Sequence, residues 1–326
     1  MSLFKNVYPF DGHYLDRDGM RLHYLDEGPH GLDEGPHGLD EGPQGGVALG
    51  EARLDEALHP TPVVMVHGNP SWSIYYRNLV IALRSGRRCI VPDHIGCGLS
   101  DKPSDERYKY TLQSRVDDLD ALIAHTVPEG KLSLVVHDWG GMIGMAWATA
   151  HPDRVDRLVI LNTAAFHNPR GTKVPFPLWL ARNTGIGSLL VRHFNAFARG
   201  AARFGVRRPL SAEVRSAYLA PYDTPDHRIA TLRFVQDVPL QPDDPAWAVV
   251  SRTDEGLALL ADKPTLICWG MRDFVFDRAF LEVWRERVPA AQVHEFEDGG
   301  HYVLEDESER IVPLVQAFLA AGGAGS

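Results

Sequence analysis

Asp138 is the residue of this chain with the clearest potential for covalent chemistry. It follows a short apolar run rich in β-branched residues, 131–136, which predicts a buried strand. It precedes a run of small residues, beginning at Gly140 and Gly141, which predicts a tightly packed helix. A sharp turn between a strand and a helix exposes one side chain, and a carboxylate exposed there can attack carbon and form an ester. The alternative is that Asp138 only caps the helix that follows it.

His301 and Asp273 are candidate partners of this carboxylate. His301 follows two glycines on a loop near the C-terminus, and Asp273 follows a predicted strand at 264–269. Along the chain, Asp138, Asp273 and His301 then follow the order nucleophile, acid, base. This order matches a catalytic triad whose nucleophile lies on a turn between a strand and a helix. In this hypothesis His301 is the base and Asp273 orients it. Asp273 could instead be an ordinary loop carboxylate near the start of the next helix.

A second position for the acid can be tested from the sequence. It follows a predicted strand at 157–161, where this chain has Asn162. An amide cannot offset the charge of an imidazolium, so Asp273 remains the candidate acid.

The loop His67-Gly68-Asn69-Pro70 is a further candidate element of the site. It ends an apolar run at 63–66 that predicts a strand. A loop in this position can supply hydrogen-bond donors to a developing anion, opposite the turn at Asp138. An ordinary strand-ending turn would have a similar sequence.

The composition is that of a globular protein, with 326 residues, of which 44% are hydrophobic and 23% charged. A net charge of -10 argues against nucleic acid or an anionic membrane as an electrostatic partner. The three cysteines show no metal-binding or redox spacing, which favours incidental thiols in a reducing compartment. The sequence has no secretory h-region and no long apolar run, so we expect a cytoplasmic protein.

A short acidic repeat interrupts the N-terminal part. Residues 26–32 recur as 33–39 and, imperfectly, at 40–45, and each copy contains Gly and Pro, which exclude a helix. A metal site at His30 and His37 is the alternative, but a Gly/Pro-spaced acidic tract is more typical of a solvated loop. We therefore expect residues 26–60 to be a flexible insertion between two strands.

From residue 62 onward predicted strands alternate with helices, which predicts an α/β fold with a mostly parallel central sheet covered by helices. The alternation breaks at 166–261, which is mostly helical in pattern and follows the strand ending near Asn162. An insertion there would lie over the carboxyl ends of the strands, where ligands bind. We expect a core of residues 1–165 and 262–326 with a helical cap at 166–261. An extra helical layer without a cavity is the alternative.

Together, Asp138, His301, Asp273, the loop at 67–70 and the cap resemble the haloalkane dehalogenase-like branch of the α/β hydrolases. The resemblance covers essentially the whole chain except the repeat insertion. It implies an α/β-hydrolase fold and an Asp nucleophile that attacks an sp³ carbon. It also implies that Asn69 and Trp139 hold the leaving anion, since an amide N–H₂ and an indole N–H donate without bringing a full charge.

Three longer stretches resemble, more narrowly, the β-lactone decarboxylases of bacterial long-chain olefin biosynthesis. These stretches are residues 67–77, 88–103 and 161–166. That family converts cis-3-alkyl-4-alkyl-oxetan-2-ones into cis-alkenes and carbon dioxide, so the resemblance implies this activity. Residue chemistry alone does not separate it from haloalkane dehalogenation, because both reactions need a carboxylate nucleophile, an anion cradle and an apolar pocket.

Two other functions remain open from the sequence. Epoxide hydrolases of the same branch usually carry an aromatic residue at the position of Asn69, although their cap tyrosines could correspond to Tyr218 and Tyr222. A receptor built on the same fold would have lost a catalytic group, whereas here every role has a candidate residue.

The expected binding partners follow from the same resemblance. We expect a small hydrophobic substrate and no cofactor, because no nucleotide loop or metal-ligand cluster occurs. The olefin pathway implies neighbouring enzymes in a multi-enzyme assembly. The arginine-rich segment 192–208 is a candidate docking face, although a solvated basic helix has the same pattern.

Overall fold

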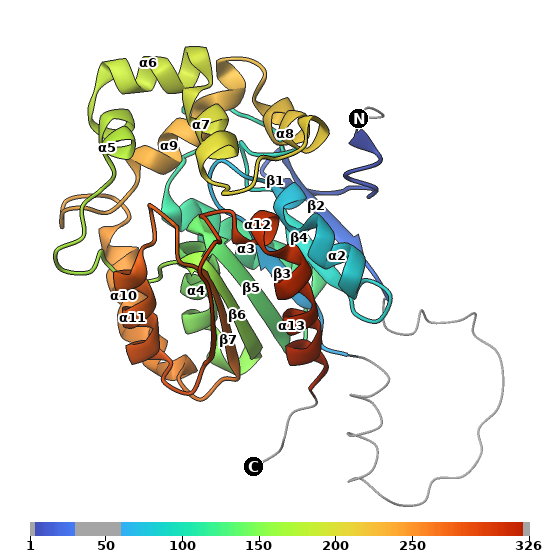
Figure 1. The fold of residues 1–326 in the computed structure, drawn as a ribbon. Helices are drawn as coiled ribbons and strands as arrows, with labels where there is room; N and C mark the ends of the chain where they lie inside the picture. Colours follow the sequence, from blue (N-terminus) through green and yellow to red (C-terminus); the bar gives the residue numbers. More distant parts are fainter. Residues whose placement is uncertain (1–3, 30–59, 322–326) are drawn as a thin grey trace, which may run out of the picture.

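The computed structural model describes residues 4–29 and 60–321 of the chain. Within them, eight strands form one sheet in the order β1-β2-β4-β3-β5-β6-β7-β8. The strands are β1 (His13–Arg17), β2 (Met20–Glu27), β3 (Val63–Val66), β4 (Cys89–Pro92), β5 (Leu132–Asp138), β6 (Val155–Thr163), β7 (Thr265–Gly270) and β8 (Gln292–Phe296). β1 pairs with β2 and β2 with β4 in antiparallel fashion, whereas all other neighbours are parallel. The predicted mostly parallel sheet is confirmed (Figure 1).

The first two strands form a hairpin whose turn is Asp18-Gly19, both residues having positive φ. β2 continues through Asp26 and Glu27, which pair with β4. The expected insertion at 26–60 therefore begins inside a strand. The rest of that insertion, with His30 and His37, lies outside the described residues.

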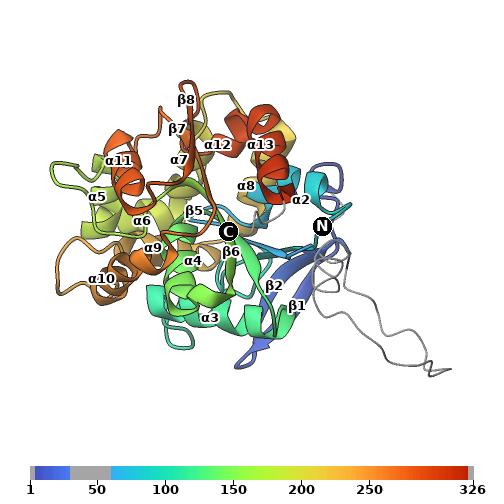
Figure 2. The same ribbon diagram turned by 90° about the horizontal axis from the view of Figure 1, so that it is seen from below.

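Two apolar layers cover the two faces of the sheet. α3 (Leu112–Thr126), α4 (Trp139–Ala150) and α11 (Arg278–Arg287) contribute to one layer, and α2 (Arg77–Leu83), α12 (Val303–Asp306) and α13 (Ser308–Ala320) to the other (Figures 1 and 2). Side chains of the strands alternate between the layers: Val64 and Val66 face the first, Val63 and Met65 the second. This burial on both sides explains the unbroken apolar runs of the strands. No helix in the described part of the chain is long and apolar enough to cross a membrane.

Six helices lie between β6 and β7. They are α5 (Phe176–Asn183), α6 (Gly185–Phe194), α7 (Ala196–Phe204), α8 (Ala212–Leu219), α9 (Ile229–Gln236) and α10 (Trp247–Gly256). α5–α9 form a layer above the carboxyl ends of the strands, and we call these five helices the cap (Figure 1). α10 instead packs against α4, because Val249 and Val250 join the apolar layer beside the sheet. The expected cap of 166–261 thus includes one helix that the structure places in the core.

The three cysteines, Cys89, Cys97 and Cys268, are free and buried. Burial raises the pKa of the Cys89 and Cys268 thiols to about 12 and that of Cys97 to about 11. These thiols are therefore protonated at neutral pH and inert as nucleophiles.

Candidate active site

Asp138 occupies a strained turn between β5 and α4. Its φ of 52° and ψ of -127° lie in a region that L-residues rarely adopt. The turn closes because residues 140 and 141 are glycines: a Cβ would overlap the Val66 carbonyl at the first position and the Thr163 hydroxyl at the second. Asp138 is the N-cap residue of α4, but its side chain makes no capping hydrogen bond to the first turn, so capping alone does not account for a carboxylate here.

A backbone donor from the loop after β3 holds one oxygen of the Asp138 carboxylate. Oδ1 accepts a hydrogen bond of 2.6 Å from the Asn69 N–H, and the carboxylate also accepts from the Trp139 N–H. Residue 68 must be glycine here, since a Cβ would overlap Oδ1. This arrangement fixes Oδ1 and leaves Oδ2 for chemistry.

His301 and Asp273 complete a triad with Asp138. The Nε2 atom of His301 lies 3.6 Å from Asp138 Oδ2, and its Nδ1–H donates to Asp273 Oδ2 at 2.9 Å. The second Asp273 oxygen accepts from the Val275 N–H at 2.7 Å, which orients the carboxylate. All three side chains are buried. The structure thus brings together the three predicted residues with the spacing of a nucleophile, a base and an orienting acid.

Burial and mutual charge set the ionisation of this triad. Burial raises the pKa of Asp138, against the charge of His301 and the two backbone N–H groups. Burial lowers the pKa of His301, but the charges of Asp273 and Asp138 outweigh it and the net shift is upward. Asp138 is therefore harder to ionise than an ordinary aspartate, and His301 is easier to protonate than an ordinary histidine.

Asn162, at the alternative acid position, has a structural role. Its amide donates to the Gly270 carbonyl at 3.0 Å and accepts from the Gly270 N–H at 2.7 Å. This pair of hydrogen bonds joins β6 to the end of β7. Since Asp273 follows that end directly, Asn162 supports the segment that carries the acid.

Asn69 and Trp139 flank the carboxylate and line the same cavity. The Asn69 amide donates one hydrogen bond to the Thr231 carbonyl of the cap at 3.1 Å, which fixes its orientation and leaves its second N–H available. Within residues 4–29 and 60–321, the indole N–H of Trp139 has no hydrogen-bond partner. Two neutral donors beside a carboxylate nucleophile can stabilise an anion that forms as a bond to carbon breaks.

The cavity between the core and the cap has a volume of about 350 Å³. Asp138, His301, Asn69 and Trp139 provide its polar end. Its other walls are mostly apolar, with Asn168, Thr172 and Lys173 as further polar residues. They come from the segment leading into α5, from α5 and α7, from the end of α9 and the residues after it, and from the loop after β7. Representative lining residues are Val174, Leu178, Phe197, Ala201, Val238 and Phe276. A reactive carboxylate at the end of an apolar cavity suits a substrate with long apolar parts.

Comparison with known proteins agrees with this geometry. Residues 61–308 match the α/β hydrolase fold family. A cis-3-alkyl-4-alkyloxetan-2-one decarboxylase of Shewanella oneidensis is 50% identical over 318 residues, which cover 97% of this chain and 91% of the relative. A second decarboxylase of this name, from Xanthomonas campestris, is 47% identical and covers 96% and 97%.

The chain belongs to the cis-3-alkyl-4-alkyloxetan-2-one decarboxylase family of α/β hydrolases. Haloalkane dehalogenases are more distant: one from Mycolicibacterium paratuberculosis is 34% identical and covers 98% of this chain and 97% of the relative. The crystal structure of the haloalkane dehalogenase DbeA from Bradyrhizobium elkani superimposes with a TM-score of 0.78 at 25% identity, covering 95% and 98% of the two chains. The dehalogenase-like resemblance seen in the sequence is confirmed.

Tyr218 and Tyr222, the two tyrosines considered for epoxide hydrolysis, lie away from the active-site cavity. The Tyr218 hydroxyl hydrogen-bonds to Glu305 at 2.5 Å, and the Tyr222 hydroxyl donates to the Ser71 carbonyl at 3.2 Å. Both side chains are buried, and neither lines the cavity among the described residues. Tyr218 and Tyr222 are therefore not placed to activate an epoxide oxygen in this cavity.

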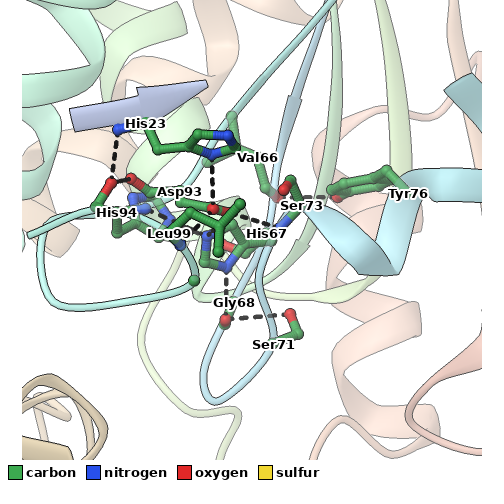
Figure 3. A network of polar contacts seen from close by, with 12 residues as sticks. His23, Val66, His67, Gly68, Ser71, Ser73, Tyr76, Asp93, His94 and Leu99 are labelled. Carbon is green, nitrogen blue, oxygen red and sulfur yellow. Dashed lines mark hydrogen bonds and ion pairs between the residues drawn. The ribbon is translucent and has the colours of Figure 1, made fainter. Parts of the chain in front are cut away.

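A buried polar network behind the loop at 67–70 was not predicted from the sequence (Figure 3). The Asp93 carboxylate accepts hydrogen bonds from the N–H groups of Ser73 and Leu99 and from the His23 ring, at 2.6, 2.8 and 2.8 Å. Burial alone would raise the pKa of Asp93, but the charge and hydrogen bond of His23 lower it to about 2. Asp93 thereby ties β2, β4 and the segment after the loop into one unit.

His67 and His94 connect this network to the loop itself. The His94 ring N–H donates to the His67 carbonyl at 2.9 Å, and the His67 ring N–H donates to the Gly68 carbonyl at 2.8 Å. Burial lowers the pKa of both histidines, so both are neutral at pH 7. The two carbonyls that accept these bonds belong to His67 and Gly68, which directly precede Asn69. The histidines therefore fix the backbone that carries the Asn69 N–H, the donor that holds Asp138.

Replacing Asp93 by Asn should lower the free energy of unfolding by about 3 kcal/mol, because an amide N–H₂ would then face buried backbone donors. The lowered pKa of Asp93 adds stability that is present above pH 3.8 and is lost as the pH falls towards 2. Urea unfolding at several pH values should therefore show wild type and variant converging in stability on acidification.

Asp101→Asn is the matched control, since Asp101 is partly exposed and pairs with exposed Arg21. This substitution should lower the free energy of unfolding by less than about 1 kcal/mol. Equal losses in the two variants would show that the Asp93 network does not stabilise the fold.

The buried position of Arg115 was also not predicted from the sequence. The residue lies on α3, is fully buried, and places its guanidinium 3.6 Å from the ring centre of Phe234. Phe234 in turn packs edge-on against Trp139. A single arginine in an amphipathic helix carries no sequence signal for burial, because most such residues face solvent. Here the cation lies behind the indole that lines the anion site.

Within the described ranges, no group of three or more His, Cys, Asp or Glu side chains is arranged to hold a metal ion.

Proposed function

We propose that this protein decarboxylates cis-3-alkyl-4-alkyl-oxetan-2-ones to cis-alkenes and carbon dioxide, with Asp138 as the nucleophile. The observation that carries the proposal is the identity of 50% and 47% to two decarboxylases of that name over nearly the whole chain. The free Oδ2 of Asp138, next to two neutral donors and an apolar cavity, supplies the chemistry such a reaction needs.

Attack at the ring carbon that bears the ring oxygen accounts for decarboxylation. Asp138 Oδ2 forms a bond to this carbon, the carbon–oxygen bond of the ring breaks, and a free carboxylate appears on the neighbouring carbon. The bond to that carboxylate then breaks to release carbon dioxide. Its electrons form the alkene, and the ester bond returns its electrons to Asp138. Attack at the lactone carbonyl would leave no free carboxylate, so we favour the ring carbon.

This route also accounts for a cis product. Displacement by Asp138 inverts the attacked carbon. Carbon dioxide and the Asp138 carboxylate then leave from opposite faces. Because the first step inverted one carbon, the overall result is the same as losing carbon dioxide from one face of the original ring. Two alkyl groups that are cis on the lactone therefore end cis on the alkene.

Asn69 and Trp139 would hold the carboxylate that ring opening creates. Both residues line the cavity together with Asp138. Neutral donors suit this role, because a full positive charge bonded directly to the new carboxylate would stabilise it and oppose its loss as carbon dioxide, whereas the charge of His301 faces Asp138 Oδ2.

His301 would act mainly through its charge. The reaction as written consumes no water, so it needs no general base. The raised pKa of His301 favours its protonated form. That form, 3.6 Å from Asp138 Oδ2, stabilises Asp138 as it leaves and is a poor base for water. Hydrolysis of the ester to a hydroxy acid is then slower than loss of carbon dioxide.

Replacing His301 by Gln should move the acidic limb of kcat/KM for alkene formation to higher pH. Asp138 must be ionised to attack, and its pKa is already raised by burial, against the charge of His301. Removing that charge raises the pKa of Asp138 further, so activity is lost earlier as the pH falls. The pH profiles of kcat/KM for wild type and His301→Gln measure the shift. Superimposable acidic limbs would show that His301 does not control the ionisation of Asp138.

Haloalkane dehalogenation is the second candidate. The 34% identity to a dehalogenase and the same triad geometry favour it over other reactions of the fold. In that case His301 activates water to hydrolyse an alkyl ester on Asp138. The two reactions differ in the fate of one intermediate.

A paired turnover assay tests the proposed function. Purified protein receives a cis-dialkyl β-lactone in one arm, with alkene measured by gas chromatography, and 1-bromo- and 1-iodoalkanes in the other, with halide measured. The proposal predicts cis-alkene and little halide. Halide and alcohol without alkene would establish the dehalogenase instead. Formation of neither alkene nor halide would contradict both assignments.

We also propose that the protein works in the cytoplasm, in an assembly with the enzymes that make its β-lactone. The support is the resemblance to olefin-biosynthesis decarboxylases and the water-insolubility of a dialkyl lactone, which favours direct transfer between neighbouring enzymes.

A further inference from the structure

The charge of this chain is unevenly distributed. Residues 166–208 contain eight Lys or Arg and no Asp or Glu, although the whole chain carries -10. The remainder therefore carries -18. The overall negative charge, which argued against an anionic partner, conceals a strongly positive segment that covers α5, α6 and α7.

Most of these cations are free on the surface. Arg182 pairs with Asp244, and Arg192 pairs with Asp226. The other six are exposed and form no ion pair with a residue of the described part of the chain. They are Arg170, Lys173, Arg199, Arg203, Arg207 and Arg208.

The same three helices expose large apolar side chains. Seven of the eleven exposed large hydrophobic residues of the described chain belong to them, so the clustering is not random. They are Phe176, Trp179, Ile186, Leu189, Leu190, Phe194 and Phe204. We call these seven residues, with the six free cations, the α5–α7 face. α6 is the outermost helix of the cap, on the side away from the sheet (Figure 1).

α6 shows how the face is built. Ile186, Leu189 and Leu190 follow the spacing of one helical stripe and are exposed, whereas Gly187 and Val191 face the cap interior. The helix is thus apolar on its outer side as well as its inner side. An outer stripe of this kind in a water-facing helix indicates a surface that binds something.

The α5–α7 face adjoins the mouth of the active-site cavity. Phe204 and Lys173 belong to the face and also line the cavity. Phe274, which lines the cavity from the core side, is half exposed as well. A molecule docked on the face would therefore lie next to the entrance.

We propose that the α5–α7 face binds the surface of an anionic lipid bilayer and brings the mouth of the cavity to the membrane. Interfacial helices combine Trp, Phe and Leu on one side with Lys and Arg beside them. The apolar side chains enter the head-group region, and the cations pair with anionic lipids. This inference rests on the surface alone and does not depend on which reaction Asp138 performs.

A second copy of this chain fits the face less well. Two copies joined through it would oppose the six free positive charges of one face to the six of the other. Docking of the face on the acidic remainder of another copy would give open chains instead of a closed dimer. A fluid, uniformly anionic surface satisfies both the charge and the apolar stripe.

Binding of the full chain to lipid vesicles tests the proposal. One set of vesicles is pure phosphatidylcholine, and the other contains phosphatidylglycerol in addition. We expect binding to the anionic vesicles to be stronger by at least about tenfold and to weaken with salt. No binding, or equal binding to both sets, would overturn the proposal.

Two double variants locate the binding surface. Ile186→Ser with Leu189→Ser removes apolar contact, and Arg199→Glu with Arg203→Glu reverses two charges. Each should weaken binding by at least about tenfold. These four residues do not line the cavity among the described residues, so turnover of a soluble short-chain substrate should not change.

Matched controls lie outside the α5–α7 face. Tyr14→Ser with Ile81→Ser changes two exposed apolar residues on β1 and α2, and Arg107→Glu with Lys109→Glu makes the same charge change elsewhere. Both should leave binding within about twofold of wild type. Equal losses in controls and face variants would overturn the assignment of the face. So would a wild-type dimer in ultracentrifugation that the face variants dissociate, which would assign the face to a second copy.

Discussion

Replacing Asp138 by Asn should reduce alkene formation from a cis-dialkyl β-lactone by about 10⁴-fold or more, because no other group can form the ester. Asn suits the experiment because it tolerates the positive φ of this position better than Ala does. Its side-chain oxygen can also keep the hydrogen bond from the Asn69 N–H. Gas chromatography of the alkene measures the effect.

The stability of the same variant separates chemistry from folding. Asp138 is a buried carboxylate at a strained φ, so its replacement by a neutral side chain should leave the free energy of unfolding unchanged or raise it. Asp138→Ala, which is more strained at this φ, should be equally inactive. Retention of alkene formation in Asp138→Asn would exclude a covalent role for Asp138.

Replacing Trp139 by Phe should lower kcat for alkene formation by about 10²-fold, the usual loss for one donor to a developing anion. Phe retains an aromatic ring to pack against Phe234, so the change removes the N–H with little repacking. Asn69→Leu should have an effect of similar size, although it also leaves the Thr231 carbonyl without its donor.

Trp147→Phe is the matched control for Trp139→Phe. Trp147 is buried on the same helix, and its indole N–H donates to Asp120 at 3.0 Å, outside the cavity. The control should reduce stability slightly and leave kcat unchanged within about twofold. Equal rates for Trp139→Phe and wild type would show that the indole N–H does not stabilise the anion.

The proximity of Asp138, Asp273 and His301 was predictable from the sequence, because each residue follows a predicted strand. These strands end at one edge of a parallel sheet. A helical segment between β6 and β7 was predictable in kind, because a helical run broke the alternation of strands and helices.

Other features depend on contacts that the sequence does not announce. Asp93 bonds to His23, which lies 70 residues earlier in the chain, and no local pattern links the two. The sequence of α10 does not indicate whether the helix packs against the cap or against α4 of the core. The stacking of the Arg115 guanidinium on Phe234 likewise depends on the tertiary fold. In each case the deciding interaction is long-range.

Turnover in water enriched in oxygen-18 tests the central claim most directly. After many turnovers of a cis-dialkyl β-lactone, the product is analysed and the peptide containing Asp138 is weighed by mass spectrometry. We predict cis-alkene and an unlabelled Asp138, because the ester breaks at the substrate carbon and no water attacks the Asp138 carbonyl. A hydroxy acid product with oxygen-18 in Asp138 would contradict the account, since it would show that the intermediate is hydrolysed.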